Sequence, residues 1–363
     1  MTSEALLAVA TRGKFFWNPG MTFPSTAQPA VSVVMPVRNA AGTVLEAINS
    51  VRQQNFSDWD LIVVDDGSSD GTSRILDEAS RNDRRVRVIF RPRDGISAAL
   101  NRGIKESCAR YIARLDADDL ALPDRLAAQV AFITENPSIG LVASQVRFGG
   151  DRQEAGGYAA YLDWSNALLT PCEIYLNRFV ESPLAHPSVL FRRELVKVHG
   201  GYRDGDFPED YELWLRWLGA GVRMAKVARE LVQWNDPPSR LSRTDERYSI
   251  DAFYRCKTPF LAAWVQSRRP DSPLYIWGAG KVARQRAGLL SAHGIQPVGY
   301  VDIDPNKIGR SVKGVPVIGI DQIPPPGRCF VLSYVGSRGA GEIIRRNLRE
   351  RGHREGWDFY LAA

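Results

Sequence analysis

Three aspartates stand within four residues of one another, as Asp116, Asp118 and Asp119 in "YIARLDADDLALPDRL". Carboxylates this close repel one another, so a fold that keeps them together needs a counter-charge or strong solvation. A divalent cation supplies such a charge, and hard oxygen ligands suit Mg²⁺ or Mn²⁺. A cation held this way can bind a diphosphate and stabilise the charge that develops when the diphosphate departs. The plainer interpretation is a solvated turn in which Asp119 caps the helix expected near Pro123.

A second carboxylate pair, Glu209 and Asp210, lies in "FPEDYELWLRW" at the start of an expected helix. A carboxylate near a hydroxyl nucleophile can accept its proton, which contributes typically 10²–10⁴-fold to a rate. Since a free aspartate has a pKa of about 3.9, we expect Asp210 to be ionised at neutral pH without a large shift. The alternative is that both acids only stabilise the helix, because their negative charges lie near the positive, N-terminal end of its dipole.

The elements that must position these carboxylates alternate between buried strands and amphipathic helices. Apolar runs predict strands at 31–37, 60–66, 86–90 and 109–116, and helical spacing predicts helices at 42–54, 70–80 and 95–108. Repeated β-α units of this length predict a mostly parallel sheet with helices on both faces. Because ligands bind beyond the carboxyl ends of such strands, Asn39, Asp65, Asp66 and the aspartate cluster should share one cleft.

The second half of the chain has a different pattern. It predicts strands at 139–148 and 186–193, a helix at 209–218, and a long helix at 243–269 that bridges to another unit. The helix at 209–218 should bury the stripe formed by Leu213, Trp214, Trp217 and Leu218.

A glycine-rich turn opens the last unit of the chain. Gly278, Gly280 and Ala283 follow an expected strand in the G-x-G-x-x-A spacing, and Asp302 ends the next strand, which is the dinucleotide-binding fingerprint. The expected division is a flexible leader at 1–29, a main domain at 30–240, the bridging helix at 241–270 and a smaller α/β domain at 271–363.

Composition excludes several classes of protein. The chain has 363 residues with 47 basic and 41 acidic side chains, a net charge of +6, and no basic tract with interleaved aromatics that would predict nucleic-acid binding. Its four cysteines are far apart, which argues against structural zinc or disulfides and for a reducing cytoplasm. No apolar run reaches the roughly 20 residues that span a bilayer, and the N-terminus is a poor signal peptide. A position at the inner face of the membrane stays open.

Four blocks in order resemble family-2 glycosyltransferases: the segment from Val31 to Thr72, "GISAALNRGI", "YIARLDADD" and "FPEDYELWLRW". The resemblance covers about half of the chain, from Val31 to Leu218. It implies a GT-A fold, a nucleoside-diphosphate sugar donor (a UDP-sugar is favoured), a divalent metal and inversion at the anomeric carbon.

The resemblance also assigns residues. It implies that Asp210 is the catalytic base, that Asp118 binds the metal, and that Asp116 faces the metal shell or the ribose. It places the donor at Pro36, Val37, Arg38, Asn39, Asp65, Asp66, Asn101, Asp116 and Ala117. Position 38 is Arg where many relatives carry Tyr, and because Arg can stack on a base or reach a phosphate, the nucleotide is left open. His186 is either a third metal ligand, an acceptor contact, or a loop histidine with no catalytic role.

The C-terminal unit resembles the nucleotide-binding-like half-domain at the front of some sugar O- or N-acyltransferases, through "IWGAGKVARQ", "VGYVDIDP", "GVPVIG" and "DFYLA". This implies a Rossmann-like sheet in which Gly278, Gly280 and Asp302 bind a second nucleotide. The alternative is that the glycines only allow close packing of helix on strand, and that the unit is a scaffold or a dimer surface.

The expected function is therefore the metal-dependent, inverting transfer of a sugar, of the hexosyltransferase type, in polysaccharide or glycoconjugate assembly. The acceptor would be a saccharide or a lipid-linked hydroxyl compound, and a lipid-linked acceptor would place the bridging helix near the membrane. Two other hypotheses are kept: an NAD(P)-dependent oxidoreductase that uses the C-terminal fingerprint, and a sugar-nucleotide-binding protein without catalysis.

Overall fold

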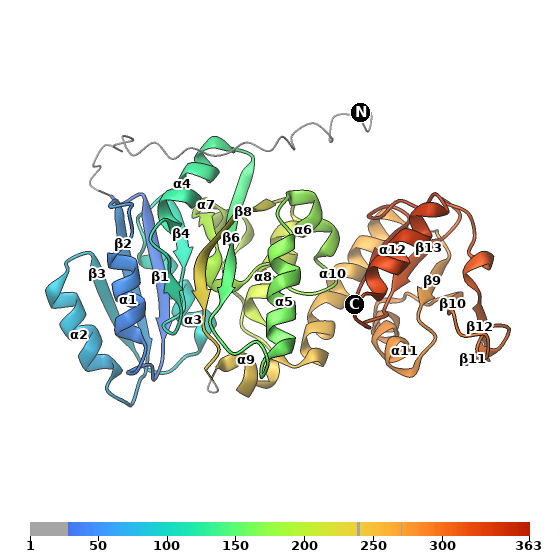
Figure 1. Ribbon diagram of the computed structural model, residues 1–363, viewed down its shortest axis with the longest axis horizontal. Helices are drawn as coiled ribbons and strands as arrows, with labels where there is room; N and C mark the ends of the chain where they lie inside the picture. Colours follow the sequence, from blue (N-terminus) through green and yellow to red (C-terminus); the bar gives the residue numbers. More distant parts are fainter. Residues whose placement is uncertain (1–27, 238–239, 270) are drawn as a thin grey trace.

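The computed structural model describes residues 28–237, 240–269 and 271–363, so the expected leader at 1–29 lies almost entirely outside the described residues. Two α/β units lie side by side along the molecule, with the long helix α10 (Ile250–Arg268) between them (Figure 1). In the described residues, no helix is both long enough and apolar enough to cross a membrane.

The larger sheet has eight strands in the order β3-β2-β1-β4-β7-β6-β8-β5. β1 is parallel to both β2 and β4, and β2 is parallel to β3, as the β-α pattern predicts. β7 runs antiparallel to β4 and β6 and so interrupts the parallel part of the sheet. The strands are β1 Val31–Val37, β2 Trp59–Asp66, β3 Val86–Arg91, β4 Tyr111–Arg114, β5 Leu120–Ala121, β6 Ile139–Phe148, β7 Leu190–Arg192 and β8 Arg223–Trp234.

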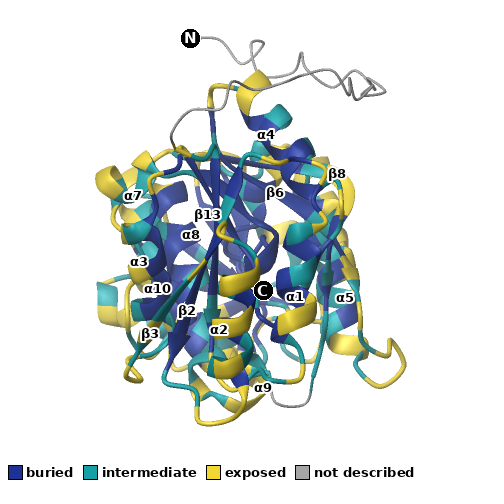
Figure 2. Ribbon diagram, turned by 90° about the vertical axis from the view of Figure 1, so that its left-hand side faces the viewer, coloured by how far each residue is buried: buried dark blue, intermediate teal, exposed yellow. Residues whose placement is uncertain are grey.

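Helices cover both faces of this sheet, and the strands between them are buried (Figure 2). Along β1, Val33 and Met35 join the core cluster that contains α1 and α4, whereas Val34 packs with α3 and α8. Coverage on both sides explains why β1 is a continuous apolar run rather than an alternating one. The helices are α1 Val44–Arg52, α2 Thr72–Asn82, α3 Ile96–Glu106, α4 Arg125–Glu135, α5 Gly156–Ala167, α6 Pro171–Asn177, α7 Glu194–His199 and α8 Glu209–Gly219.

Helix α8 carries the predicted tryptophans, and their predicted packing is confirmed. Trp214 and Trp217 are fully buried, and Leu213 and Leu218 join the same core cluster. The stripe fixes the rotation of the helix about its axis. It therefore also fixes the direction in which the acidic first turn of the helix faces.

The single helix predicted over 243–269 is wrong in its first part. The chain forms a short α9 (Leu241–Thr244) and a 3₁₀ turn, and α10 runs only from Ile250 to Arg268. Ser249 starts α10 because its side chain accepts a hydrogen bond from the backbone N–H of Ala252, which satisfies a free donor of the first turn.

The smaller unit has a six-stranded sheet in the order β11-β12-β10-β9-β13-β14, parallel except for the β11–β12 pair. Its elements are β9 Leu274–Trp277, α11 Lys281–Gly288, β10 Gly299–Val301, β11 Ser311–Val312, β12 Val315–Ile318, β13 Phe330–Ser333, α12 Ala340–Glu350 and β14 Phe359–Leu361.

The two units share one hydrophobic core. A single cluster of buried side chains contains Phe179 and Leu215 of the larger unit, Leu261 of α10, and Ile276 and Phe330 of the smaller sheet. Polar contacts reinforce this boundary, because the side chain of Arg178 donates to the Tyr360 hydroxyl (2.9 Å) and that of Arg345 to the Asn177 amide oxygen (2.6 Å). The smaller unit is therefore packed onto the larger one and not merely tethered to it.

Candidate active site

The aspartate cluster lies in the turn between β4 and β5, at the carboxyl end of β4. Asp116, Asp118 and Asp119 each offer a carboxylate oxygen, and these three atoms lie within 4.8 Å of one another. Burial, and next the charge of Asp116, raise the pKa of Asp118 to about 6. Burial and Asp116 also raise the pKa of Asp119. The cluster thus has the crowding of negative charge that a cation relieves.

Asp119 has a different role from the one predicted, because it does not cap the following helix. Helix α4 begins at Arg125, with Asp124 at its N-cap position. The Oδ1 atom of Asp119 accepts a hydrogen bond from the backbone N–H of Asn235 (2.8 Å), and its buried Oδ2 has no hydrogen-bond partner. A buried carboxylate oxygen without a partner is costly. The residues present therefore fit a hard divalent cation with oxygen ligands.

Asp116 is held by a cation from its own strand. Its carboxylate forms an ion pair with the buried guanidinium of Arg114 at the end of β4. Burial acts to lower the pKa of Arg114, but the charge and hydrogen bond of Asp116 outweigh it and raise that pKa. Arg114 stays charged and orients one oxygen of Asp116.

A first cavity of about 670 Å³ opens beyond the carboxyl ends of β1, β2 and β4. It brings together seven of the nine predicted donor residues and the predicted metal ligand: Pro36, Val37, Arg38, Asn39, Asp66, Asp116, Ala117 and Asp118. Arg93, Arg240 and Arg247 line it too, and the sequence analysis did not find them. Arginines in polar loops carry no spacing signal, so only the folded chain brings them to this cavity.

Asp66 builds part of the wall of the first cavity. Its two oxygens accept hydrogen bonds from the backbone N–H groups of Asp94 (2.7 Å) and Gly95 (3.0 Å). Gly95 has φ +90°, a backbone conformation that favours glycine. This carboxylate therefore fixes the turn that carries Arg93 into the cavity.

Asp65 and Asn101 line neither of the two cavities described here, so their predicted contact with a donor stays a prediction. Asp65 accepts from the backbone N–H and the hydroxyl of Ser68 and from the hydroxyl of Ser73, so its carboxylate organises the turn after β2. Asn101 uses its amide on the backbone of Tyr202, both donating to its carbonyl (2.8 Å) and accepting from its N–H (2.9 Å). Both side chains support the loops around the site.

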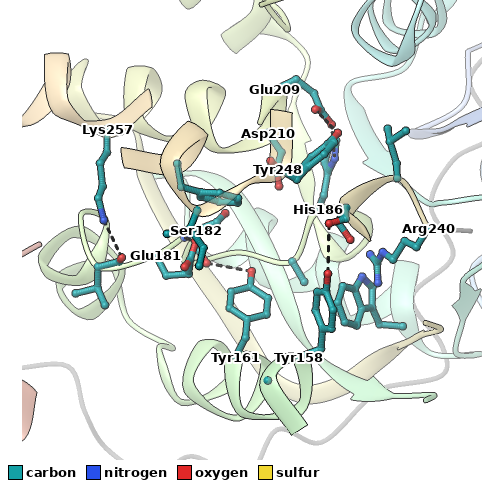
Figure 3. Close-up of a pocket in the computed structure, with 18 of the residues that line it drawn as sticks. Tyr158, Tyr161, Glu181, Ser182, His186, Glu209, Asp210, Arg240, Tyr248 and Lys257 are labelled. Carbon is teal, nitrogen blue, oxygen red and sulfur yellow. Dashed lines mark hydrogen bonds and ion pairs between the residues drawn. The ribbon is translucent and has the colours of Figure 1, made fainter. Parts of the chain in front are cut away.

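A second cavity of about 720 Å³ meets the first one. The residues that line both are Ile96, Asp116, Asp118, Arg240 and Leu241. The second cavity is rich in aromatic side chains: Tyr158, Tyr161, Trp234, Tyr248, Phe253 and Tyr254. The predicted base, Asp210, lines this second cavity, and Figure 3 shows it on the side opposite Tyr158 and Tyr161.

The first turn of α8 places Asp210 and Glu209 differently. Glu209 is buried, accepts a hydrogen bond from the Tyr248 hydroxyl (2.5 Å), and lies 3.6 Å from Nδ1 of His186. Asp210 is half-buried, and one of its oxygens accepts from the backbone N–H of Tyr211 (2.7 Å). Burial, followed by the neighbouring charge of Glu209, raises the pKa of Asp210 to about 8. This direction differs from the expectation that Asp210 is ionised at neutral pH without a large shift of its pKa.

His186 is not placed as a metal ligand. Its Nε2 lies 2.8 Å from the Tyr202 hydroxyl, its Nδ1 faces Glu209, and it is not part of the aspartate cluster. Burial, with the charges of Arg114 and Arg240, lowers its pKa well below the usual value, so the ring is neutral. His186 lines the second cavity, as an acceptor contact would.

The C-terminal glycine turn favours the packing interpretation over a second nucleotide site. Gly278 has φ +119°, and a Cβ there would lie 2.9 Å from the Cβ of Ala283. Asp302 accepts hydrogen bonds from the backbone N–H of Ala279 (3.0 Å) and from Nζ of Lys307 (3.1 Å), so its carboxylate closes the turn. Neither cavity reaches Gly278, Gly280 or Asp302. The turn therefore gives the oxidoreductase hypothesis no support.

Comparisons with known proteins agree with this geometry. Residues 32–200 match the family model described as glycosyl transferase family 2. The putative glycosyltransferase EpsE of Bacillus subtilis is 29% identical over 281 residues, which are 72% of this chain and 98% of the relative. The O-antigen biosynthesis glycosyltransferase WbnJ of Escherichia coli is 26% identical over 243 residues, which are 66% of this chain and 90% of the relative.

A solved structure shares the fold. The crystal structure of S. aureus TarS 1-349 in complex with UDP-GlcNAc has a TM-score of 0.51 and 17% sequence identity, and the match covers 72% of this chain and 70% of that chain. Residues 32–200 therefore form a glycosyl transferase family 2 domain with a GT-A fold, and the chain is a glycosyltransferase.

Proposed function

We propose that the protein transfers a sugar from a nucleoside-diphosphate sugar to a hydroxyl group of a saccharide or lipid-linked acceptor, with a divalent cation and with inversion. The observation that carries the proposal is that two cavities meet at Asp116 and Asp118, while Asp210 faces only the second. A donor in the first cavity would then present its sugar to an acceptor in the second. The setting that suits such a reaction is polysaccharide or glycoconjugate assembly.

The first cavity suits a nucleoside diphosphate. Asp66, beside the backbone of Pro36 to Asn39, offers a carboxylate to the nucleoside, and Arg93, Arg240 and Arg247 offer positive charge to phosphate oxygens. Arg240 stacks on Trp234, with its guanidinium carbon 3.4 Å from the ring centroid, and this contact holds it at the junction of the two cavities.

Asp116, Asp118 and Asp119 would hold Mg²⁺ or Mn²⁺. When bound, the cation supplies positive charge at the departing diphosphate. The buried, unpartnered Oδ2 of Asp119 supports this assignment independently of the motif. Which of the two ions is used is left to experiment.

Asp210 would accept the proton of the attacking hydroxyl. Of the two acids of α8 that line the second cavity, Glu209 is engaged by Tyr248, which leaves the carboxylate of Asp210 available to a ligand there. One base on the acceptor side suits direct displacement, in which the hydroxyl attacks the face of the sugar opposite the diphosphate. Such a displacement inverts the anomeric carbon.

A thermal-shift experiment with UDP-, GDP- and dTDP-sugars tests donor binding. We expect at least one nucleotide sugar, with a UDP-sugar favoured, to raise the melting temperature by about 3–6 °C at roughly a hundredfold excess over its Kd, and only with Mn²⁺ or Mg²⁺. The control is each nucleotide sugar with EDTA. No stabilisation by any donor with either metal would reject the proposal.

The pH dependence of transfer tests the role of Asp210. A base acts when it is deprotonated, and because its pKa is raised to about 8, the active form increases as the pH rises through 8. We expect the rate at low acceptor concentration, measured with Mg²⁺ from pH 6 to pH 9, to rise about tenfold per unit at the acid end and to level off above pH 8. A flat profile over this range would contradict Asp210 as a base with a raised pKa.

A further inference from the structure

The second cavity extends from the aspartate cluster into the C-terminal unit. Its lining includes Lys257 of α10, Arg286 of α11, and Gly336 in the turn after β13. Figure 3 shows Arg240 at one end of the cavity and Lys257 with Glu181 at the opposite end, and Asp210 lies between them. A ligand whose hydroxyl reaches Asp210 therefore has room to continue toward the C-terminal unit.

The residues of the C-terminal unit that line the cavity follow the neighbouring strands β9 and β13, where the sheet has a topological switch point. β9 lies between β10 and β13, so the chain leaves β9 to one side through α11 and later returns to pair on its other side. Ligands of open α/β sheets bind outside the carboxyl ends of the strands at such a point. Arg286 and Gly336 come from the elements that follow β9 and β13, and a Cβ on Gly336 would lie 3.4 Å from Nη1 of Arg286.

Arg286 and Lys257 differ in how their charges are used. The Lys257 ammonium donates to the carbonyls of Val180 (3.1 Å) and Ala362 (2.8 Å), and its burial lowers its pKa to about 7. Arg286 instead stacks on Tyr254, with its guanidinium carbon 4.3 Å from the ring centroid, and it takes part in none of the ion pairs among the described residues. Its guanidinium is thus held in place while its charge faces the cavity.

One carboxyl group, Glu181, lies at this end of the cavity. It is half-buried, and its burial raises its pKa, although the charges of Lys257 and Arg286 act to lower it. Beside this acid, Arg286 supplies a guanidinium and Lys257 an ammonium group whose protonation changes near neutral pH. A guanidinium with free donors binds carboxylate or phosphate groups in a bidentate manner.

We propose that the C-terminal unit forms the distal end of the acceptor site, and that Arg286 there binds an anionic group, a carboxylate or a phosphate, on the acceptor glycan. This rests on the proposed function, because it takes the second cavity as the acceptor site. The shared core of the two units makes this end a fixed wall rather than a moving part. The C-terminal unit thereby contributes to acceptor specificity without binding a nucleotide.

The charge part of the inference is tested with an array of neutral, uronic-acid-containing and phosphorylated oligosaccharides, in the presence of the nucleotide sugar and Mg²⁺. We expect the wild-type protein to transfer to, or bind, glycans that carry an acid, and Arg286→Gln to lower kcat/KM for them at least tenfold, mainly through KM. Arg286→Lys should restore part of this loss. Lys281→Gln removes the same charge from an exposed position of α11 and should change nothing. The uronic-acid and phosphate members distinguish the two sources of charge.

The wall itself is tested by Gly336→Leu, which fills the end of the cavity beside Arg286 and removes no charged residue. It should raise KM for the same acceptors at least tenfold and leave the donor Kd and the slow hydrolysis of the donor unchanged. Selection of neutral glycans only, no binding of any acidic glycan, or full activity of Arg286→Gln and Gly336→Leu would overturn the inference. Donor binding in the presence of metal is measured for all these variants as well. The proposed function fails only if donor binding or transfer itself is absent, so the two proposals fail by different results. Melting temperatures show whether each variant is folded.

Discussion

Replacement of Asp210 by asparagine is expected to lower the rate of sugar transfer by 10²–10⁴, with the donor Kd unchanged. The reason is that the hydroxyl must lose its proton as it attacks, and an asparagine cannot accept that proton. The expected loss corresponds to about 3–5 kcal/mol of transition-state stabilisation. Asn keeps the size of the side chain and an oxygen for the hydrogen bond from Tyr211, so α8 should begin as before.

The measurement combines steady-state transfer with calorimetric titration of the donor. Asp206→Asn, at an exposed position in the loop before α8, makes the same chemical change away from the cavities and should behave like the wild type. Transfer by Asp210→Asn within threefold of wild type would remove Asp210 from the mechanism. A wild-type protein that binds the donor but transfers nothing would favour the sugar-nucleotide-binding hypothesis instead.

The parallel half of the larger sheet was predictable because its strands are buried on both faces. "VSVVMPV" is a plain apolar run, and β1 spans those residues, Val31–Val37. Strand β8 was missed because charged residues interrupt its pattern. Lys226 is buried there, with its ammonium donating to the Ser165 hydroxyl (2.8 Å), and the register against β6 shifts near Gln145. Such a strand has no clean period that sequence reasoning can detect.

The first cavity was largely predictable and the second was not, for one physical reason. The first is built at the ends of consecutive parallel strands, so the rule for open α/β sheets places Asn39, Asp66 and the aspartates together. The second collects Tyr158, Glu181, Tyr248 and Arg286 from helices and loops far apart in the sequence, which no local spacing connects. The raised pKa of Asp210 has the same origin, because burial is a property of the assembled fold.

Asp65, Asp66 and Asn101 illustrate the limit of assigning roles from motif positions. Both aspartates end β2, but only Asp66 lines the first cavity, while Asp65 is turned to Ser68 and Ser73. Successive residues within a strand point to opposite faces of the sheet, so the side chains of Asp65 and Asp66 point in different directions. Asn101 lies one element away, and its amide is already satisfied by the backbone of Tyr202. A motif thus predicts which residues lie near one another, and the fold decides which of their side chains line the cavity.

Asp118→Ala is expected to abolish the metal-dependent stabilisation by the nucleotide sugar and to lower transfer by at least about a hundredfold. Loss of one oxygen ligand weakens the binding of the cation. Even the loss of groups that only orient metal ligands typically lowers metal affinity or activity by 10–100-fold. Thermal shift against Mn²⁺ concentration at fixed donor measures this, and transfer is measured alongside. Asp77→Ala, at an exposed position of α2, makes the same change of charge and should keep both responses.

Asp119→Asn tests whether Asp119 is a metal ligand or only a structural side chain of the cluster. The Oδ1 atom can still accept from the N–H of Asn235, so the contact with the end of β8 survives, whereas an NH₂ group replaces the unpartnered Oδ2. If Oδ2 is a ligand, this variant should lose the Mn²⁺ response as Asp118→Ala does while its melting temperature without metal falls little. If Asp119 only anchors Asn235, the Mn²⁺ response should persist at wild-type strength, and the cation would then be held by Asp116 and Asp118 alone.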